Sequence, residues 1–106
     1  MRLAVVSSDG ENVDLHLGRG NSIYVYDWDG KLSFAEHREV EISKDSKHQG
    51  GKVIKACSDC DVLIATQYGF KSKIKAEDDG IKLVMDEGPV CEVLKRYIDH
   101  ILFMEK

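Results

Sequence analysis

The hydrophobic positions of this chain follow two spacings, which together predict alternating strands and helices. Continuous apolar runs over 3–6 (LAVV) and 61–65 (DVLIA) are typical of short strands that are buried on both faces. A further strand of this kind is predicted over 81–85 (IKLVM). Between Ser22 and Trp28, apolar and aromatic residues alternate with a period of two, which favours a half-buried strand.

The dipeptide Asp29-Gly30 predicts the turn of a β-hairpin after the alternating strand. A two-residue loop of type I′ needs a positive φ at both central positions, and Asp-Gly is well suited to it. The return strand is expected to start at Lys31 and to reach as far as Val40.

Helical spacing predicts three helices in the second half of the chain. The first passes through Val53 and Cys57, and it starts either in a capping box formed by Ser46 and Gln49 or as late as Gly50. The second contains Phe70 and Ile74 and is expected to stop at Gly80, which can take the left-handed conformation of a helix C-cap.

The last helix is expected to begin at Pro89, because proline suits the first helical position, where its missing N–H has no intrahelical partner. Its apolar residues recur at helical spacing and form one stripe that should pack on the sheet. The residues of the stripe are Val90, Val93, Leu94, Tyr97, Ile98, Ile101 and Leu102.

This order of elements predicts an α/β fold with a five-stranded mixed sheet and about three helices. The first strand is expected at the centre, with the hairpin antiparallel on one side of it. The two later strands alternate with helices, which implies parallel pairing through right-handed crossovers on the other side. Residues 1–106 contain no repeat or linker, so we expect a single domain.

Composition narrows the range of functions. The formal net charge of −4 argues against non-specific nucleic-acid binding, which depends on a basic surface. No apolar run approaches the ~20 residues of a membrane span, and the N-terminus lacks the pattern of a signal peptide. We therefore expect a cytoplasmic protein without nucleic-acid or membrane partners. The three cysteines are expected to be reduced thiols.

The predicted topology brings four polar segments to the carboxyl ends of the strands: 7–20, 47–51, 66–69 and 86–91. Ligands bind at this edge in open α/β sheets. The segments carry the chain's candidate binding residues, which are His16, Arg19, His48, Gln67, Tyr68 and Cys91.

The chemistry of these residues suggests capture of a metal-containing anion. Imidazoles and a thiolate are good ligands for iron and zinc, and a cysteine in the first turn of a helix has a stabilised thiolate. Arg19 could pair with an anionic group. The closely spaced glycines at 18 and 20 and at 50 and 51 would let backbone N–H groups, or neighbouring backbone, approach closely.

Four segments resemble the nitrogenase iron–molybdenum cofactor biosynthesis family. HLGR resembles the family's HFGR segment, and HQGGKVIKA resembles its histidine- and glycine-rich entry to the first helix. DVLIATQYG and GIKLVMDEGPVCEVLKRY match its later strands and last helix in the same order. The resemblance covers nearly the whole chain. It implies a ribonuclease H-like fold that binds an iron–sulfur cofactor or precursor without catalysing a reaction.

The resemblance also implies roles for particular residues. The family's motif histidine corresponds to His16, its arginine to Arg19, and one helix-entry histidine to His48. The chain departs from the family at Leu17, where phenylalanine is usual, and at Lys47, where many relatives have a second histidine.

We therefore predict that the protein binds an iron–sulfur or iron–molybdenum-type cluster and exchanges it with a donor or acceptor protein. The predicted metal ligands are His16, His48 and Cys91. The predicted cofactor-binding residues are His16, Gly18, Arg19, His48, Gly50, Tyr68 and Gly69.

Each of these residues also has an interpretation that involves no binding. The loop of His16 and Arg19 could be a solvated turn with ion pairs to Asp9, Glu11 or Asp14. Cys91 is more typical of a small buried hydrophobic residue. His37, His48 and His100 could simply be surface residues.

The pair Cys57 and Cys60 forms a C-x-x-C motif that can bind zinc, bind a cluster or act in redox chemistry. The pair lies at the end of a helix and supplies only two ligands, so packing at the helix terminus is the favoured interpretation. A zinc site shared between two copies is the other option.

For the whole protein, a nuclease would need clustered carboxylates to hold metal ions. The first strand carries no carboxylate in its centre, and Asp9 and Asp86 reach the relevant edge only in loops. We expect no enzyme activity. The main alternative to a cluster carrier is a regulatory or protein-interaction module of the same fold that binds no cluster.

Overall fold

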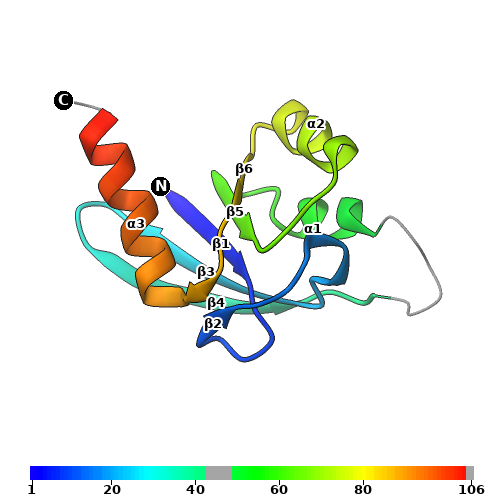
Figure 1. Ribbon diagram of the computed structural model, residues 1–106, viewed down its shortest axis with the longest axis horizontal. Coiled ribbons are helices and arrows are strands. Elements are labelled where there is room, and N and C mark those ends of the chain that lie inside the picture. The colour runs from blue at the N-terminus through cyan, green and yellow to red at the C-terminus, as the bar shows by residue number, and fades with distance from the viewer. Residues whose placement is uncertain (43–48, 105–106) are drawn as a thin grey trace.

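The computed structural model describes residues 1–42 and 49–104 (Figure 1). In chain order the elements are β1 Arg2–Val6, β2 Asn12–Val13, a 3₁₀ turn η1 Leu17–Arg19, β3 Ser22–Trp28, β4 Leu32–Glu39, α1 Gly50–Ala56, β5 Val62–Ala65, α2 Phe70–Asp78, β6 Lys82–Met85, β7 Gly88–Pro89 and α3 Val90–Met104.

The main sheet has five strands in the order β4-β3-β1-β5-β6. β1 is central and pairs antiparallel with β3, which pairs antiparallel with β4. On its other side β1 pairs parallel with β5, and β5 pairs parallel with β6. The predicted α/β class and the predicted mixed sheet are therefore confirmed.

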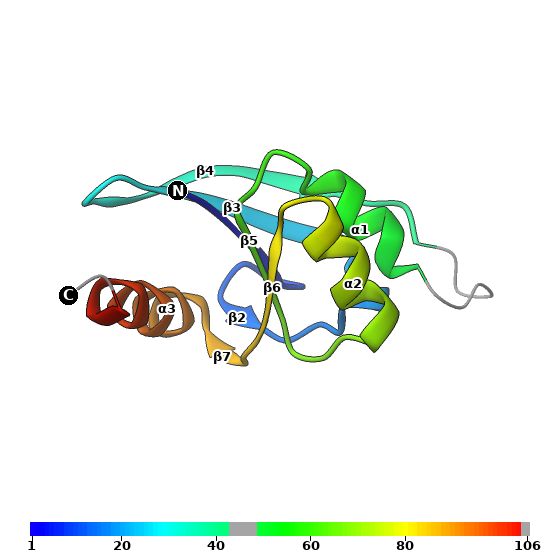
Figure 2. The same cartoon turned by 90° about the horizontal axis from the view of Figure 1, so that it is seen from above.

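Helices cover both faces of the sheet, as the continuous apolar strands predict. α1 and α2 lie on one face and α3 on the other (Figure 2). Along β1, Ala4 and Val6 face the first cluster of buried residues, whereas Leu3 and Val5 face the second. None of the helices in the described ranges has the length and apolar character needed to cross a bilayer.

The hairpin forms where Asp29-Gly30 predicts it, but its loop is one residue longer. Trp28 pairs with Leu32, so Lys31 also lies in the loop. Gly30 has a φ of 106° and supplies the turn's left-handed conformation. The ladder closes one residue later than a type I′ loop would require, and Ala35 on β4 forms a bulge opposite Val25 and Tyr26.

The start of α1 agrees with one of its two predicted positions, whereas the start of α3 differs from the prediction by one residue. α1 begins at Gly50, the later of the two expected starts, with Gln49 at the N-cap position and no side-chain cap. Ser46, the proposed partner in a capping box, lies outside the described residues. Pro89 is not the first helical residue, because it pairs with Asn12 in the small β2-β7 sheet and α3 starts at Val90.

The end of α2 follows the prediction. Asp79 is the C-cap, and Gly80 follows it with a φ of 79°, the left-handed conformation expected for a terminating glycine.

Candidate functional site

Backbone hydrogen bonds tie the histidine loop to the carboxyl end of β5. The N–H of Leu17 donates to the carbonyl oxygen of Gln67 at 2.9 Å, and the N–H of Thr66 donates to the carbonyl oxygen of Leu15 at 3.0 Å. His16 lies between these two connections. Its backbone position is therefore fixed although its side chain is exposed.

The segment after β6 joins the same edge. The N–H of Asp86 donates to the carbonyl oxygen of Ala65 at 3.1 Å, and the N–H of Val90 donates to the carbonyl oxygen of Glu11 at 2.9 Å. Three of the four predicted segments thus meet. From the fourth, Gln49 and Gly50 are buried beside this region, whereas Lys47 and His48 lie outside the described residues.

An open groove of about 920 Å³ lies where these three segments meet. Its walls come from the loop around β2, the end of β5 and the turn between β6 and β7. The lining residues are Asn12, Val13, Asp14, His16, Thr66, Gln67, Met85, Asp86, Glu87 and Gly88.

His16 and Arg19 flank the 3₁₀ turn η1, and their side chains are exposed. Neither side chain makes a hydrogen bond or an ion pair with any residue of 1–42 or 49–104. If this loop were only a solvated turn, His16 and Arg19 would be expected to form ion pairs with nearby carboxylates such as Asp9, and within these ranges they do not. Asp9 instead accepts hydrogen bonds from the N–H groups of Glu11 and Asn12, which lower its pKa.

The glycines of this region differ in their surroundings. A Cβ on Gly20 would lie 2.9 Å from a methyl carbon of Val6, and one on Gly50 would lie 2.7 Å from the Ser72 hydroxyl. These two glycines are therefore explained by close packing. A Cβ on Gly18 or Gly69 would meet no atom within 4 Å, so the surface beside them is open.

Two carboxylates on the groove wall already have partners. Asp86 accepts two hydrogen bonds from Arg96, at 3.0 and 3.1 Å, and this guanidinium lowers the pKa of Asp86. Asp14 accepts hydrogen bonds from the N–H and the hydroxyl of Ser8. The bidentate pair with Arg96 compensates one of the negative charges facing the groove.

Thr66 is a groove residue that the sequence analysis did not single out. Its hydroxyl oxygen is buried and has no hydrogen-bond partner in the described part of the chain. A buried hydroxyl normally finds a partner, so its position in the groove wall marks a polar contact available to a ligand. The signal in the sequence was weak, because a threonine after a strand is common.

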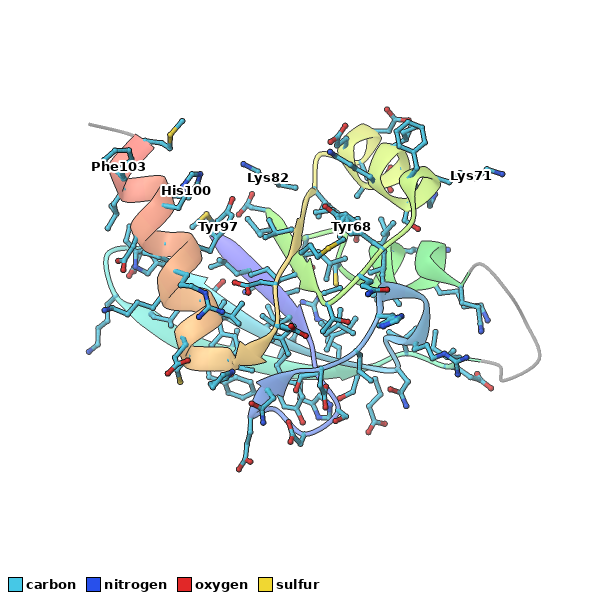
Figure 3. All side chains as sticks on the ribbon, in the orientation of Figure 1. Tyr68, Lys71, Lys82, Tyr97, His100 and Phe103 are labelled. Atoms are coloured by element: carbon cyan, nitrogen blue, oxygen red, sulfur yellow. The ribbon has the colours of Figure 1, made fainter. Side chains whose placement is uncertain are left out.

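Other predicted site residues lie elsewhere. Tyr68 is half-buried and packs against the core cluster beneath α1 and α2 (Figure 3). Cys91 is exposed and does not line the groove. The preceding residue, Val90, belongs to the second core cluster, against which Tyr26 of β3 packs. The expectation that Cys91 is a buried hydrophobic residue is wrong.

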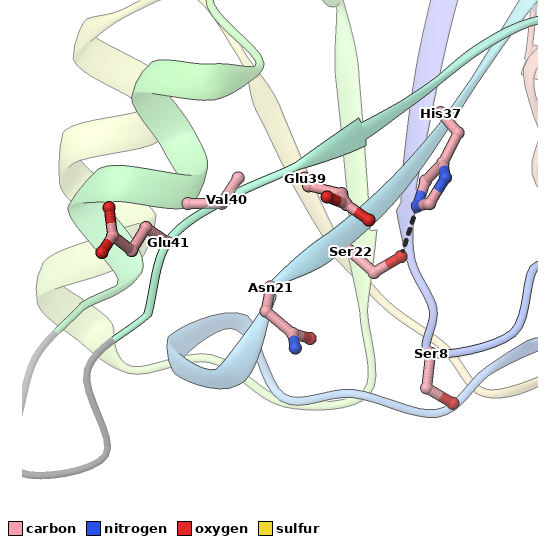
Figure 4. Close-up of a pocket in the computed structure, with 7 residues that line it drawn as sticks. All are labelled: Ser8, Asn21, Ser22, His37, Glu39, Val40 and Glu41. Carbon is pink, nitrogen blue, oxygen red and sulfur yellow. Dashed lines mark hydrogen bonds between the residues drawn. The ribbon is translucent and has the colours of Figure 1, made fainter.

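A second hollow, of about 580 Å³, lies beside the ends of β3 and β4 (Figure 4). The Ser22 hydroxyl lies 2.7 Å from Nε2 of His37, and the His37 ring stacks on Tyr24 with 4.3 Å between centroids. His37 is thus a surface residue, as predicted, held by two neighbours. Glu39 and Glu41 also line this hollow.

Comparison with known proteins decides the family. The family model described as dinitrogenase iron-molybdenum cofactor matches residues 1–100. The chain belongs to the dinitrogenase iron-molybdenum cofactor family. The predicted resemblance is therefore confirmed, and it links the chain to iron–molybdenum cofactor biosynthesis. No curated protein matches the chain significantly.

Solved structures share the fold of this family member. The crystal structure of PH0822 is 22% identical, with a TM-score of 0.77, and the match covers 94% of this chain and 92% of that one. An NMR structure from Thermotoga, TM1290, provisionally described as a NifB protein of the DUF35 family, is 23% identical with a TM-score of 0.66. That match covers 92% of this chain and 87% of that one.

Proposed function

We propose that this protein is a small non-catalytic binding protein that carries, or helps insert, an iron–sulfur or iron–molybdenum-type cofactor or its precursor. The observation that supports this most is the state of His16. Its backbone is held between two hydrogen-bonded connections to the end of β5, whereas its imidazole is exposed at the groove and has no partner in the described ranges. An imidazole that is held in place by its backbone and makes no other hydrogen bond is available to bind a metal.

The neighbouring residues would assist His16 in distinct ways. Arg19 has no partner in the described ranges and would contact the anionic periphery of the cluster. The open surface at Gly18 and Gly69 would admit a bulky inorganic cluster close to the backbone. The Arg96 guanidinium reduces the repulsion that Asp86 would exert on an anionic cargo.

The cluster would be cargo, so a donor protein and an acceptor protein are the partners implied. Among the described residues no three His, Cys, Asp or Glu side chains lie together in a way that could hold a metal ion. His16 would therefore hold the cluster with few protein ligands, His48 being the second imidazole predicted from the sequence. Weak, incomplete ligation is compatible with transfer to another protein.

Anaerobic incubation with a preformed [4Fe–4S] cluster, followed by gel filtration and metal analysis of the protein peak, tests the proposal. The wild-type protein should elute with iron and sulfide. The His16→Ala variant should lose most of both. His100→Ala, which removes an exposed histidine of α3, is the matched control and should retain the cluster (Figure 3).

The second candidate is a regulatory or interaction module of the same fold that binds no cluster. If all three proteins elute free of iron under these conditions, the carrier proposal is wrong and this candidate replaces it. If the His16→Ala variant retains as much iron as wild type, the assignment of His16 as a ligand is wrong.

A further inference from the structure

A pair of cysteines lies at the opposite end of the sheet from the groove, where β1 and β5 begin. Cys57 is the C-cap residue of α1, and the N–H of Cys60 donates to the carbonyl oxygen of Cys57 at 2.9 Å. This bond closes a four-residue turn, and such turns bring their first and last Cα atoms within about 7 Å. Disulfides typically span Cα separations of about 4.4–6.8 Å, so the turn has suitable dimensions.

The two thiols differ in acidity. The interaction between the neighbouring thiols lowers the pKa of Cys60 and raises the pKa of Cys57. Burial also raises the pKa of Cys57. Cys60 is therefore the sulfur better able to act as a thiolate, and Cys57 is the neighbour positioned to react with it.

Charged side chains lie beside this pair. Arg38 on β4 donates to both carboxylate oxygens of Asp59, at 2.6 and 2.7 Å, and to the carbonyl oxygen of Ala56 at 2.8 Å. The Cys60 thiol lies 3.6 Å from the same carboxylate. We name the Arg38–Asp59 contact the clasp. The Asp59 side chain is 47% exposed, so the clasp lies at the surface.

Both sulfurs are nearly inaccessible to solvent in the closed structure. Cys57 is fully buried, and Cys60 is 4% exposed. Opening the clasp means that the Asp59 carboxylate leaves both Arg38 and Arg2, which donates to it at 2.8 Å, through rotation of side chains rather than movement of the helix or the strand. Exposed ion pairs typically contribute about 0–1 kcal/mol each, so an opening of this kind does not require unfolding.

We propose that Cys57 and Cys60 form a reversible thiol–disulfide site that reacts with low-molecular-weight disulfides when the clasp opens. The Cys60 thiolate attacks one sulfur of the external disulfide, forms a mixed disulfide and releases one thiolate. The Cys57 thiol then loses its proton to solvent and attacks the Cys60 sulfur, which releases the second thiolate. The protein dithiol is oxidised by two electrons, and the external disulfide is reduced to two thiols.

This site goes beyond the proposed cluster function, and it does not depend on it. Packing of Cys57 and Cys60 in the first core cluster agrees with the interpretation that the sequence favoured.

Oxidised glutathione is the probe, and Cys91→Ser is the parent protein because Cys91 is exposed and would react separately. Mass spectrometry of the parent protein should show the loss of two hydrogens without a glutathione adduct. In the parent carrying Cys57→Ser as well, Cys60 has no partner thiol, so a stable glutathione adduct on Cys60 is expected. Circular dichroism checks that each variant is folded.

Two further substitutions in the parent protein separate clasp opening from global unfolding. Asp59→Asn removes the ion pair and a carboxylate that raises the pKa of Cys60, so it should speed oxidation several-fold. Leu94→Ala destabilises the fold from the other face of the sheet without touching the clasp. If oxidation required global unfolding, Leu94→Ala would react fastest.

The proposal is overturned if Leu94→Ala reacts faster than Asp59→Asn. It is equally overturned if both thiols of the Asp59→Asn protein stay reduced under conditions that convert Cys91 of the wild-type chain to its glutathione adduct. Formation of the internal disulfide, with Asp59→Asn fastest, supports it.

Discussion

The N–H of Leu17 donates to the carbonyl oxygen of Gln67 at 2.9 Å, which joins two loops that lie far apart in the sequence. The contact places His16 at the carboxyl end of β5, beside the segment that follows β6. The groove therefore depends on the pairing of these loops with the sheet, and changes that disturb the loop of Leu17 should alter both stability and binding.

Gly20→Ala should destabilise the protein because the new methyl group enters a packed region. A Cβ at this position would lie 2.9 Å from Val6, 3.0 Å from Val53 and 3.1 Å from the carbonyl oxygen of Leu17. Overpacking of this kind costs about 1–3 kcal/mol. Urea denaturation should show this loss, while Gly18→Ala, whose methyl group meets nothing within 4 Å, serves as the control. Equal midpoints for the two variants would contradict this account.

Leu94→Ala should create a cavity between α3 and the sheet. Leu94 is fully buried in the cluster that contains Leu3 and Val5. Replacing a buried leucine with alanine costs about 2–5 kcal/mol. Leu102→Ala on the same helix is the control, because Leu102 is 41% exposed and should cost much less. Thermal unfolding followed by circular dichroism measures the stability of both variants. An equal loss of stability in the two would contradict the burial of Leu94 between α3 and the sheet.

The stability of the protein should fall in acid partly because of Asp59. Hydrogen bonds from Arg38, and then from Arg2, lower the pKa of Asp59 in the folded protein. A carboxylate with a lowered pKa stabilises the fold above its unfolded pKa, and this contribution is lost as the pH falls from about 5 toward strong acid. The unfolding midpoint of wild type should therefore drop more steeply over this range than that of Asp59→Asn.

The control for this pH series is Asp99→Asn, which changes an exposed carboxylate of α3 that has no hydrogen bond or ion pair to a residue in the described ranges. Its pH profile should follow that of wild type. If Asp59→Asn also follows wild type throughout, then the ion pairs of Asp59 contribute nothing measurable to stability.

Arg96→Gln should loosen the groove wall between β6 and β7. Arg96 donates to both carboxylate oxygens of Asp86 and to the carbonyl oxygen of Glu87 at 3.1 Å. Without these bonds, the amides of 86–88 should exchange with deuterium several-fold faster, as hydrogen-exchange mass spectrometry can measure. Lys95→Gln, at the neighbouring exposed position, should leave exchange unchanged. Unchanged protection in Arg96→Gln would show that the turn is rigid without this contact.

Much of the fold could be predicted because its elements carry strong periodic signals. The runs at 3–6 and 61–65 are apolar on both faces, and the structure covers both faces with helices. The β2-β7 pairing could not be predicted, because a ladder formed by Asn12 and Val13 is too short to have a period. This pairing is also the reason that Pro89 lies in a strand instead of in α3.

The part of the site that follows from the order of the strands could be predicted from the sequence. His16 and Gln67 follow from their positions near the ends of the central strands, and both line the groove. The exposure of Cys91 did not follow, because its helix carries a broad apolar stripe and only the packing angle decides which residues it buries. The roles of Gly20 and Gly50 as packing positions depend on distant side chains that sequence spacing does not reveal.

The central claim is that the imidazole of His16 contacts the metal cluster. Pulsed electron paramagnetic resonance on protein labelled with ¹⁵N-histidine, loaded anaerobically with a [4Fe–4S] cluster and reduced to its paramagnetic form, tests this most directly. We predict a ¹⁵N coupling to the cluster in wild type and in His100→Ala, and its loss in His16→Ala. A loaded cluster without ¹⁵N coupling in wild type, or with unchanged coupling in His16→Ala, would contradict the claim.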